Sequence, residues 1–137
     1  MHGNTGNNWP IYRYAETLLS LAESLNEQGK PAEAATYLNM IRKRAGLADA
    51  TQADQASMRE QIAIDRRSEL AFENKRWFDL VRTGKAIETI TAYGARIKAN
   101  PLKYYYPAGN TIRGNAFSNI TLLYGLPADE AALNPNF

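Results

Sequence analysis

The chain has 137 residues, 45% hydrophobic and 22% charged, which is the composition of an ordinary globular protein of one domain. Its 16 Lys and Arg residues against 14 Asp and Glu leave a net charge of +2, too small to provide a field for nucleic acid or anionic lipid. The absence of cysteine excludes disulfides, thiolate metal sites and a thiol nucleophile, and no stretch approaches the ~20 apolar residues of a membrane span.

The opening residues predict an irregular lead-in. They are polar and glycine-rich up to Pro10, which biases the residue before it toward extended backbone. They also lack the charged start and apolar run of a secretory signal, so we expect that this chain is not the beginning of an exported parent protein. Within one segment, 1–137, we place the lead-in at 1–11, a helical core at 12–98 and a loop-rich tail at 99–137.

Two helices joined by a tight turn are expected next. Between residues 12 and 28 the apolar side chains recur at three-and-four spacing, and Gly29 ends the helix. Pro31 suits the first position of a second helix, which runs to about Ala45 before Gly46. The inward-facing stripes are expected to be Tyr12, Ala15, Leu18, Leu19, Ala22 and Leu25 on the first helix, and Ala34, Leu38, Ile41 and Ala45 on the second.

This hairpin can be compared with the tetratricopeptide pattern, in which small residues lie where two helices approach closely. Ala22 and Ala34 occupy such positions, but leucine replaces the large aromatic residues, so a true repeat unit and a generic helical hairpin both remain open. Because about three repeats are needed for a stable stack, we expect something outside this chain to cover the outer face.

A third helix is expected from Gln55 through Asn74, opened by a capping box at Thr51 and Asp54. Its apolar stripe, Ala63-Ile64, Leu70-Ala71 and Trp77-Phe78, is continued by a short helix over 77–83. We expect Leu70, Trp77 and Phe78 to pack against the hairpin. After Gly84 a fourth helix carries Ile87, Ile90, Gly94 and Ile97 on one face and ends at Asn100-Pro101, and a further helical turn is expected at 128–133. The fold class is therefore all-α, with a loop-rich tail.

The densest charged run predicts an ion-pair network. On one continuous helix, Arg66, Glu69, Glu73 and Arg76 would form a single ridge in which arginines bracket two carboxylates. Paired carboxylates also serve as acid and nucleophile in glycosidases, but the flanking arginines would keep both ionised and leave no proton donor. We therefore predict a partly buried structural network rather than catalysis. The basic clusters 42–44 and 66–67 are expected to lie on solvated helix faces.

Other side chains offer little catalytic chemistry. His2 is the only histidine, so neither a Ser-His-Asp triad nor a histidine metal cluster can be assembled, and no phosphate-binding glycine motif occurs. No metal or cofactor is expected. Exposed rings can stack on sugar faces, which makes Trp9, Tyr104, Tyr105 and Tyr106 weak ligand-binding candidates, although core or tail packing is favoured for each.

Three segments together resemble the C-terminal part of the SusD/RagB family of nutrient-binding outer-membrane lipoproteins. Residues 9–26 contain WPIYRYAETLL and AESLN, similar to the family's RYAEVLLMYAEALN helix. Residues 37–47 read YLNMIRKRAGL, similar to YLNxVRxRAGL. Residues 66–82 contain RRSELAFE and RWFDLVR, similar to ERRxELAFEGxRWFDLxRW, and the closing LNPNF resembles the family's asparagine-proline ending.

The chain departs from the family pattern in a few places. Asp65 stands for the usual glutamate, Asn74 for the usual glycine and Thr83 for a common tryptophan, while residues 125–127 are looser than the family's YPIP. Family members are also several times longer and begin with a lipidated cysteine, so we interpret the chain as a C-terminal portion of such a protein.

The resemblance implies a non-catalytic, surface-exposed outer-membrane lipoprotein that captures glycans for uptake through a SusC-type TonB-dependent transporter. In that family the ligand is mostly held by upstream loops, so no sugar-binding residue can be assigned in this chain. Two alternatives remain: a cytoplasmic tetratricopeptide-type protein-interaction module without a glycan ligand, and an enzyme fragment whose acid-base residues lie elsewhere.

Overall fold

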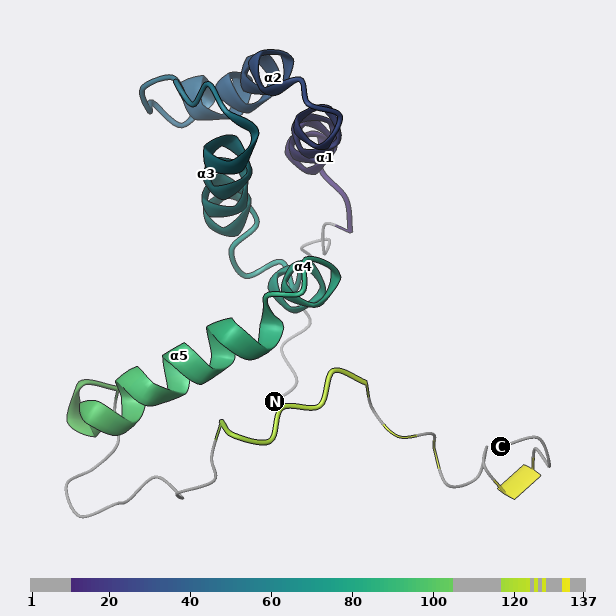
Figure 1. Ribbon diagram of the computed structural model, residues 1–137, viewed down its shortest axis with the longest axis vertical. Coiled ribbons are helices and arrows are strands. Elements are labelled where there is room, and N and C mark those ends of the chain that lie inside the picture. The colour runs from purple at the N-terminus through teal and green to yellow at the C-terminus, as the bar shows by residue number, and fades with distance from the viewer. Residues whose placement is uncertain (1–10, 105–116, 124, 126, 128–131, 134–137) are drawn as a thin grey trace, which may run out of the picture. The chain divides into compact units, whose positions relative to one another are not determined.

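The computed structural model describes residues 11–104, 117–123, 125, 127 and 132–133. Within these residues the fold is all-α, as predicted, and no strand is found. The chain forms two compact units, residues 1–76 and 77–137, which we describe separately. In chain order the helices are α1 (Tyr14–Glu27), α2 (Pro31–Arg44), α3 (Gln55–Glu69), α4 (Arg76–Arg82), α5 (Ala86–Ala99) and the 3-10 helix η1 (Pro101–Tyr104) (Figure 1). None of the described helices is long and apolar enough to cross a bilayer.

The first unit is built on the predicted hairpin. The backbone N–H of Gly29 bonds to the carbonyl of Asn26 at 2.9 Å, and that of Lys30 bonds to the carbonyl of Leu25 at 3.0 Å, which is a Schellman end to α1. Gly29 and Gly46 both adopt a left-handed φ, of 77° and 71°, that an L side chain would resist. The helix stops predicted at these glycines are confirmed.

One apolar core joins the three helices of the first unit, and α1 packs against both α2 and α3. The predicted inward stripes are confirmed in large part, although Tyr12 and Ala45 are exposed. Ala22 and Ala34 are fully buried, as expected where two helices cross closely. The core consists of Leu18, Leu19, Ala22, Ala34, Leu38, Ile41, Ala50, Met58, Ile62 and Leu70.

The predicted continuous helix from Gln55 to Asn74 is wrong at its C-terminal end. The helix α3 ends at Glu69, and a turn with left-handed φ at Phe72 (67°) and Asn74 (58°) separates it from α4. Asparagine tolerates this conformation, which accounts physically for its presence where the resemblance has glycine. The periodic pattern missed the break because no glycine or proline marks it.

The apolar stripe predicted for residues 63–78 is also wrong in part, because the helix does not continue past Glu69. Leu70 lies in the core as expected, but Ile64 and Phe78 are 58% and 69% exposed, and Trp77 is half-buried within the second unit. The face that α3 buries carries Met58, Ile62, Asp65 and Arg66 instead.

The capping box predicted to open α3 at Thr51 is also wrong. The Asp54 carboxylate accepts a 2.9 Å hydrogen bond from the backbone N–H of Ser57, so Asp54 itself is the N-cap and Thr51 is not. The hydrogen bonds from Ser57 hold the pKa of Asp54 below its usual range.

In the second unit, α5 packs against η1 and against Phe117. The Tyr93 ring meets Tyr104 and Phe117 edge-to-face, with ring centroids 6.0 and 6.1 Å apart. The predicted face of α5 is confirmed at the buried Gly94 and Ile97, but Ile87 is 53% exposed. Most of the helical turn expected at 128–133 lies outside the described residues.

Gly94 leaves the space in which Phe117 lies, and a methyl group there should be destabilising. A Cβ on Gly94 would come within 2.4 Å of the Phe117 Cβ, so Gly94→Ala should cost about 1–3 kcal/mol of unfolding free energy, more than alanine gains in a helix. Urea denaturation followed by fluorescence measures the change. In a Phe117→Ala background the same substitution should be neutral or stabilising, and an equal loss there would contradict the contact.

Candidate functional site

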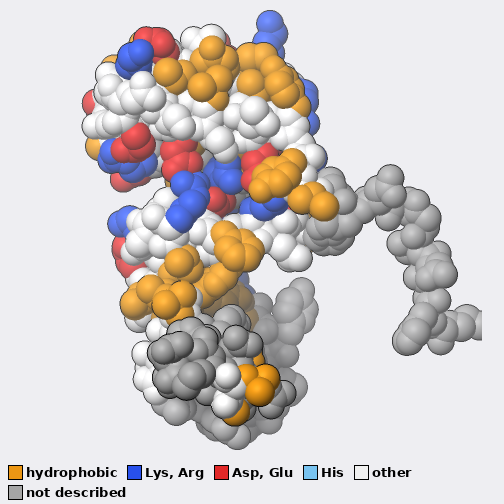
Figure 2. All heavy atoms as spheres, turned by 90° about the vertical axis from the view of Figure 1, so that its right-hand side faces the viewer, with side chains coloured by type: hydrophobic (Ala, Val, Ile, Leu, Met, Phe, Trp, Pro, Cys, Tyr) orange, Lys and Arg blue, Asp and Glu red, His pale blue; other side chains and the backbone are white. Residues whose placement is uncertain are grey.

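Charged side chains of both signs gather in one band on the face drawn in Figure 2. In the first unit, ion pairs between residues far apart in sequence join α1, α2, α3 and the turn at 70–75, and we call these charged residues the charge cluster. We define the cluster by its cations Arg13, Arg42, Arg44, Arg66 and Lys75 and its carboxylates Glu16, Asp65, Glu69 and Glu73.

Arg13 lies at the centre of this cluster. It is the N-cap residue of α1, with extended backbone that directs it out of the helix. Its Nε donates to both carboxylate oxygens of Glu73, at 2.9 and 3.0 Å, and its Nη1 donates to Glu69 Oε1 at 2.8 Å. Its Nη2 donates to the backbone carbonyl of Glu69 at 2.7 Å, which satisfies an acceptor at the C-terminal end of α3. One guanidinium thus links the start of α1 to the end of α3 and to the following turn.

The remaining contacts extend the cluster along α1. Arg66, only 8% exposed, lies with Nη2 3.3 Å from Glu16 Oε1. The other oxygen of Glu16 accepts no hydrogen bond of good geometry but lies 3.1 Å from Lys75 Nζ. Lys75 also donates to the carbonyl of Ile11 at 2.6 Å, and Arg44 of α2 pairs with Glu69. Every carboxylate in the cluster therefore has a cationic partner.

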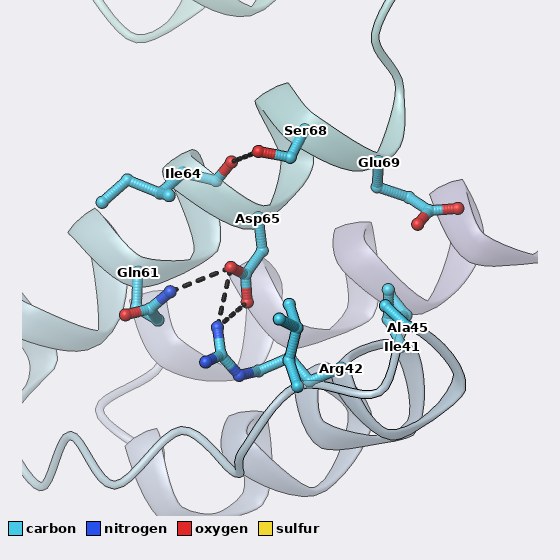
Figure 3. A pocket seen from close by; sticks show the side chains of 9 residues that line it. Ile41, Arg42, Ala45, Gln61, Ile64, Asp65, Ser68 and Glu69 are labelled. Carbon is cyan, nitrogen blue, oxygen red and sulfur yellow. Dashed lines mark hydrogen bonds and ion pairs between the residues drawn. The ribbon is translucent and has the colours of Figure 1, made fainter.

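A cavity of about 360 Å³ lies beside the cluster, between the C-terminal half of α2 and α3 (Figure 3). Arg42 points across it to Asp65, with Nη1 2.8 Å from both carboxylate oxygens, and Gln61 donates to Asp65 Oδ1 at 2.9 Å. Ile41 and Ile64 supply apolar lining. The polar groups facing the cavity bond to one another, so they offer a ligand few unsatisfied partners.

The arrangement favours structural support over acid-base chemistry. Hydrogen bonds from Arg13 hold the pKa of Glu73 below its usual range, and those to Glu73 and Glu69 raise the pKa of Arg13. A carboxylate with a lowered pKa is a poor proton donor near neutral pH. Within the described residues, no group of three His, Cys, Asp or Glu side chains is placed to hold a metal ion.

Comparison with known proteins decides the family. A family model described as the SusD family matches residues 1–136. The chain belongs to the SusD family. The resemblance seen in the three sequence segments is thereby confirmed.

Individual SusD-like relatives agree with this assignment. One from Formosa agariphila is 33% identical over 147 residues, covering 98% of this chain and 26% of the relative. A second from the same organism is 38% identical over 89 residues, covering 58% of this chain and 18% of the relative. A crystal structure of a SusD-like protein from Bacteroides fragilis matches with a TM-score of 0.60 at 42% identity, over 64% of this chain and 17% of that one. The chain thus spans about a quarter or less of these relatives' length.

The prediction that Arg66, Glu69, Glu73 and Arg76 form a single helical ridge is wrong, because α3 ends before Glu73. Arg66 pairs with Glu16, while Glu69 and Glu73 share Arg13. Arg76 begins α4, beyond the turn. Three of the four named residues therefore have partners on other elements, and the purely structural role of the network stays a prediction.

Of the four ligand-binding candidates, three lie outside the described residues: Trp9, Tyr105 and Tyr106. Tyr104 is half-buried in η1 and packs against Tyr93, which agrees with the packing interpretation without testing a ligand role.

The sequence analysis did not name Arg13, Glu16 or Arg42 as members of a network. The solvated faces predicted for Arg42 and Arg66 are wrong, because the Arg42 side chain is 15% exposed and Arg66 is buried. The burial of Arg66 agrees with the other prediction for it, membership of a partly buried ion-pair network. An available signal was the position of Glu16 and Arg66 on the stripes that bury apolar neighbours, since a charge there requires a buried partner.

The protein should lose stability in acid, in part through Glu73. Its folded pKa is lowered from 4.5, so its contribution is present above about pH 4.5 and is lost as the pH falls through the lower folded value. Glu73→Gln should therefore weaken the fall in unfolding free energy between about pH 5 and 3, read from urea midpoints at each pH. The more exposed Arg59–Glu27 pair provides the control, and Glu27→Gln should change this pH dependence less. An unchanged pH dependence in Glu73→Gln would contradict the pairing.

Proposed function

We propose that this SusD-family chain is part of a cell-surface lipoprotein that captures oligosaccharides for import through a SusC-type TonB-dependent transporter. The observation that carries the proposal is the family match over residues 1–136, supported by relatives named SusD-like. Surface display at the outer membrane and pairing with the transporter are inferred from the family alone.

Within this proposal the described residues act as scaffold. Their charge cluster is internally paired, and neither it nor the adjoining cavity carries a group poised for acid-base or nucleophilic chemistry. Capture without hydrolysis is the role that this chemistry supports. The glycan contacts are expected mainly in sequence outside this chain, as the family resemblance implies.

Oligosaccharide titration of the full-length protein tests the capture step. Binding to a panel of neutral and acidic oligosaccharides, measured by isothermal titration calorimetry, should saturate for at least one glycan, without release of shorter products on prolonged incubation. Tyr104→Ala should leave that affinity nearly unchanged, because the ring packs against Tyr93. Failure of the whole panel would oppose glycan capture, while product release would favour an enzyme.

Affinity purification from outer membranes tests the transporter partnership. The tagged full-length protein should retain a TonB-dependent transporter at near-equal stoichiometry.

The second candidate is a tetratricopeptide-type interaction module. The burial of Ala22 and Ala34, where α1 and α2 cross, suits it. That candidate would be favoured if the protein bound no glycan and retained a different protein.

A further inference from the structure

Phe72 combines an unfavourable backbone with a fully exposed ring. Its φ is 67°, in the left-handed region that a bulky aromatic residue rarely adopts, and its relative exposure is 97%. In a free surface turn, glycine or asparagine would fit this conformation better, and a polar side chain would suit the solvent better. Neither the backbone nor the exposure of Phe72 is explained by contacts within the described residues.

The turn that presents Phe72 is held on both sides. On the N-terminal side Leu70 is buried in the core. On the C-terminal side the Glu73 carboxylate accepts two hydrogen bonds from Arg13 Nε, and Lys75 Nζ donates to the carbonyl of Ile11 and lies 4.4 Å from the centroid of the Tyr12 ring. Contacts on both sides therefore hold the turn that presents the strained Phe72. Strain that surrounding contacts maintain is a feature of binding sites.

The turn is tied to a second exposed apolar segment. Ile11 and Tyr12, which Lys75 contacts, are 69% and 78% exposed. We call Ile11, Tyr12 and Phe72 together the Phe72 patch. Its neighbouring charges are already paired among themselves, because Arg13 contacts Glu69 and Glu73, and Lys75 contacts Glu16. A covering surface therefore needs apolar groups and no complementary charge.

We propose that the Phe72 patch docks into an apolar pocket provided by the remaining part of the same polypeptide. The chain spans between 17% and 26% of the length of its relatives, so a protein of that size has ample further surface to cover it. A permanent, core-like contact within one folded molecule also suits an apolar patch whose described charged neighbours are paired, because non-obligate interfaces between separate proteins are about as polar as the rest of the surface. The proposal uses the family assignment and is independent of the identity of the glycan.

Hydroxyl-radical footprinting of the wild-type full-length protein, without transporter, tests the docking directly. For each residue, the oxidation rate in the folded protein is divided by its rate in the urea-unfolded protein. The ratio for Phe72 should be several-fold below that of a solvent-exposed aromatic ring and should approach that of the fully buried Leu19. A high ratio for Phe72 would overturn the proposal. Protection that appears only on adding transporter, or only when the protein self-associates, would overturn it equally and assign the patch to that partner.

The direction in which Phe72→Gly shifts the melting temperature provides a second test. Glycine adopts a left-handed φ without strain, so Phe72→Gly should raise the melting temperature if the ring touches nothing. Docking predicts the opposite, a lower melting temperature of the full-length protein. Asn74→Gly, at the other left-handed position of the turn, is the matched control and should raise the melting temperature or leave it unchanged. A higher melting temperature for Phe72→Gly would contradict docking. Glycan titration of the same variant separates this outcome from a failure of the capture proposal.

Discussion

Leu19→Ala should lower the unfolding free energy by about 3 kcal/mol, because the side chain is fully buried and its loss leaves a cavity among helices that cannot collapse fully. Leu19 belongs to the one core shared by α1, α2 and α3, and Leu38 and Met58 in that core are also fully buried. Urea denaturation, with a midpoint shift at constant slope, is the measurement.

Leu21→Ala is the matched control for this substitution. Leu21 lies on the same helix and loses the same atoms, but it is 39% exposed, so the expected loss is below about 1 kcal/mol. Similar losses for Leu19→Ala and Leu21→Ala would contradict the assignment of the buried face of α1.

Arg13→Ala should destabilise the protein to a similar degree, by about 3 kcal/mol, although it removes no core packing. The substitution leaves the Glu69 and Glu73 carboxylates, whose side chains are 10% and 17% exposed, without their shared cation, and it frees the Glu69 carbonyl. Removing one partner of a buried pair costs more than the pair contributes, because the remaining charge stays desolvated. Thermal and urea unfolding near neutral pH measure this loss.

Two further variants separate the geometry of Arg13 from its charge. Arg13→Lys keeps the charge but cannot donate to three groups in a planar fork, so it should recover only part of the loss. Lys30→Ala removes an exposed cation that lies 3.8 Å from Glu33, so its effect should be below about 1 kcal/mol. Full recovery by lysine would show that charge alone, without the bidentate geometry, holds the turn.

Much of the fold could be predicted from the sequence because it is locally encoded. The three-and-four spacing from Ala15 to Ala22 requires only the helix repeat, and Gly29 and Gly46 end their helices through their own backbone conformation. Pro31 marks the start of α2 for a similar reason, since a proline at the first helical position loses no hydrogen bond. The predictions made from these signals are confirmed.

The errors arise where long-range contacts decide the local structure. Nothing between Gln55 and Asn74 signals a break by composition, and the turn after Glu69 is instead held by Arg13, more than fifty positions earlier in the chain. The predicted partners within the charge cluster are wrong for the same reason. Helical spacing placed Glu69 and Glu73 on one ridge with nearby arginines, but a shared partner at the N-cap of α1 cannot be inferred from spacing.

Arg13 and Glu73 should be energetically coupled across the interface between the start of α1 and the turn at 70–75. A double-mutant cycle with Arg13→Ala, Glu73→Ala and the double variant, measured by urea denaturation at neutral pH, tests it most directly. The coupling energy is expected to exceed about 1.5 kcal/mol, more than an exposed pair provides. Additive losses, with a coupling energy near zero, would contradict the account.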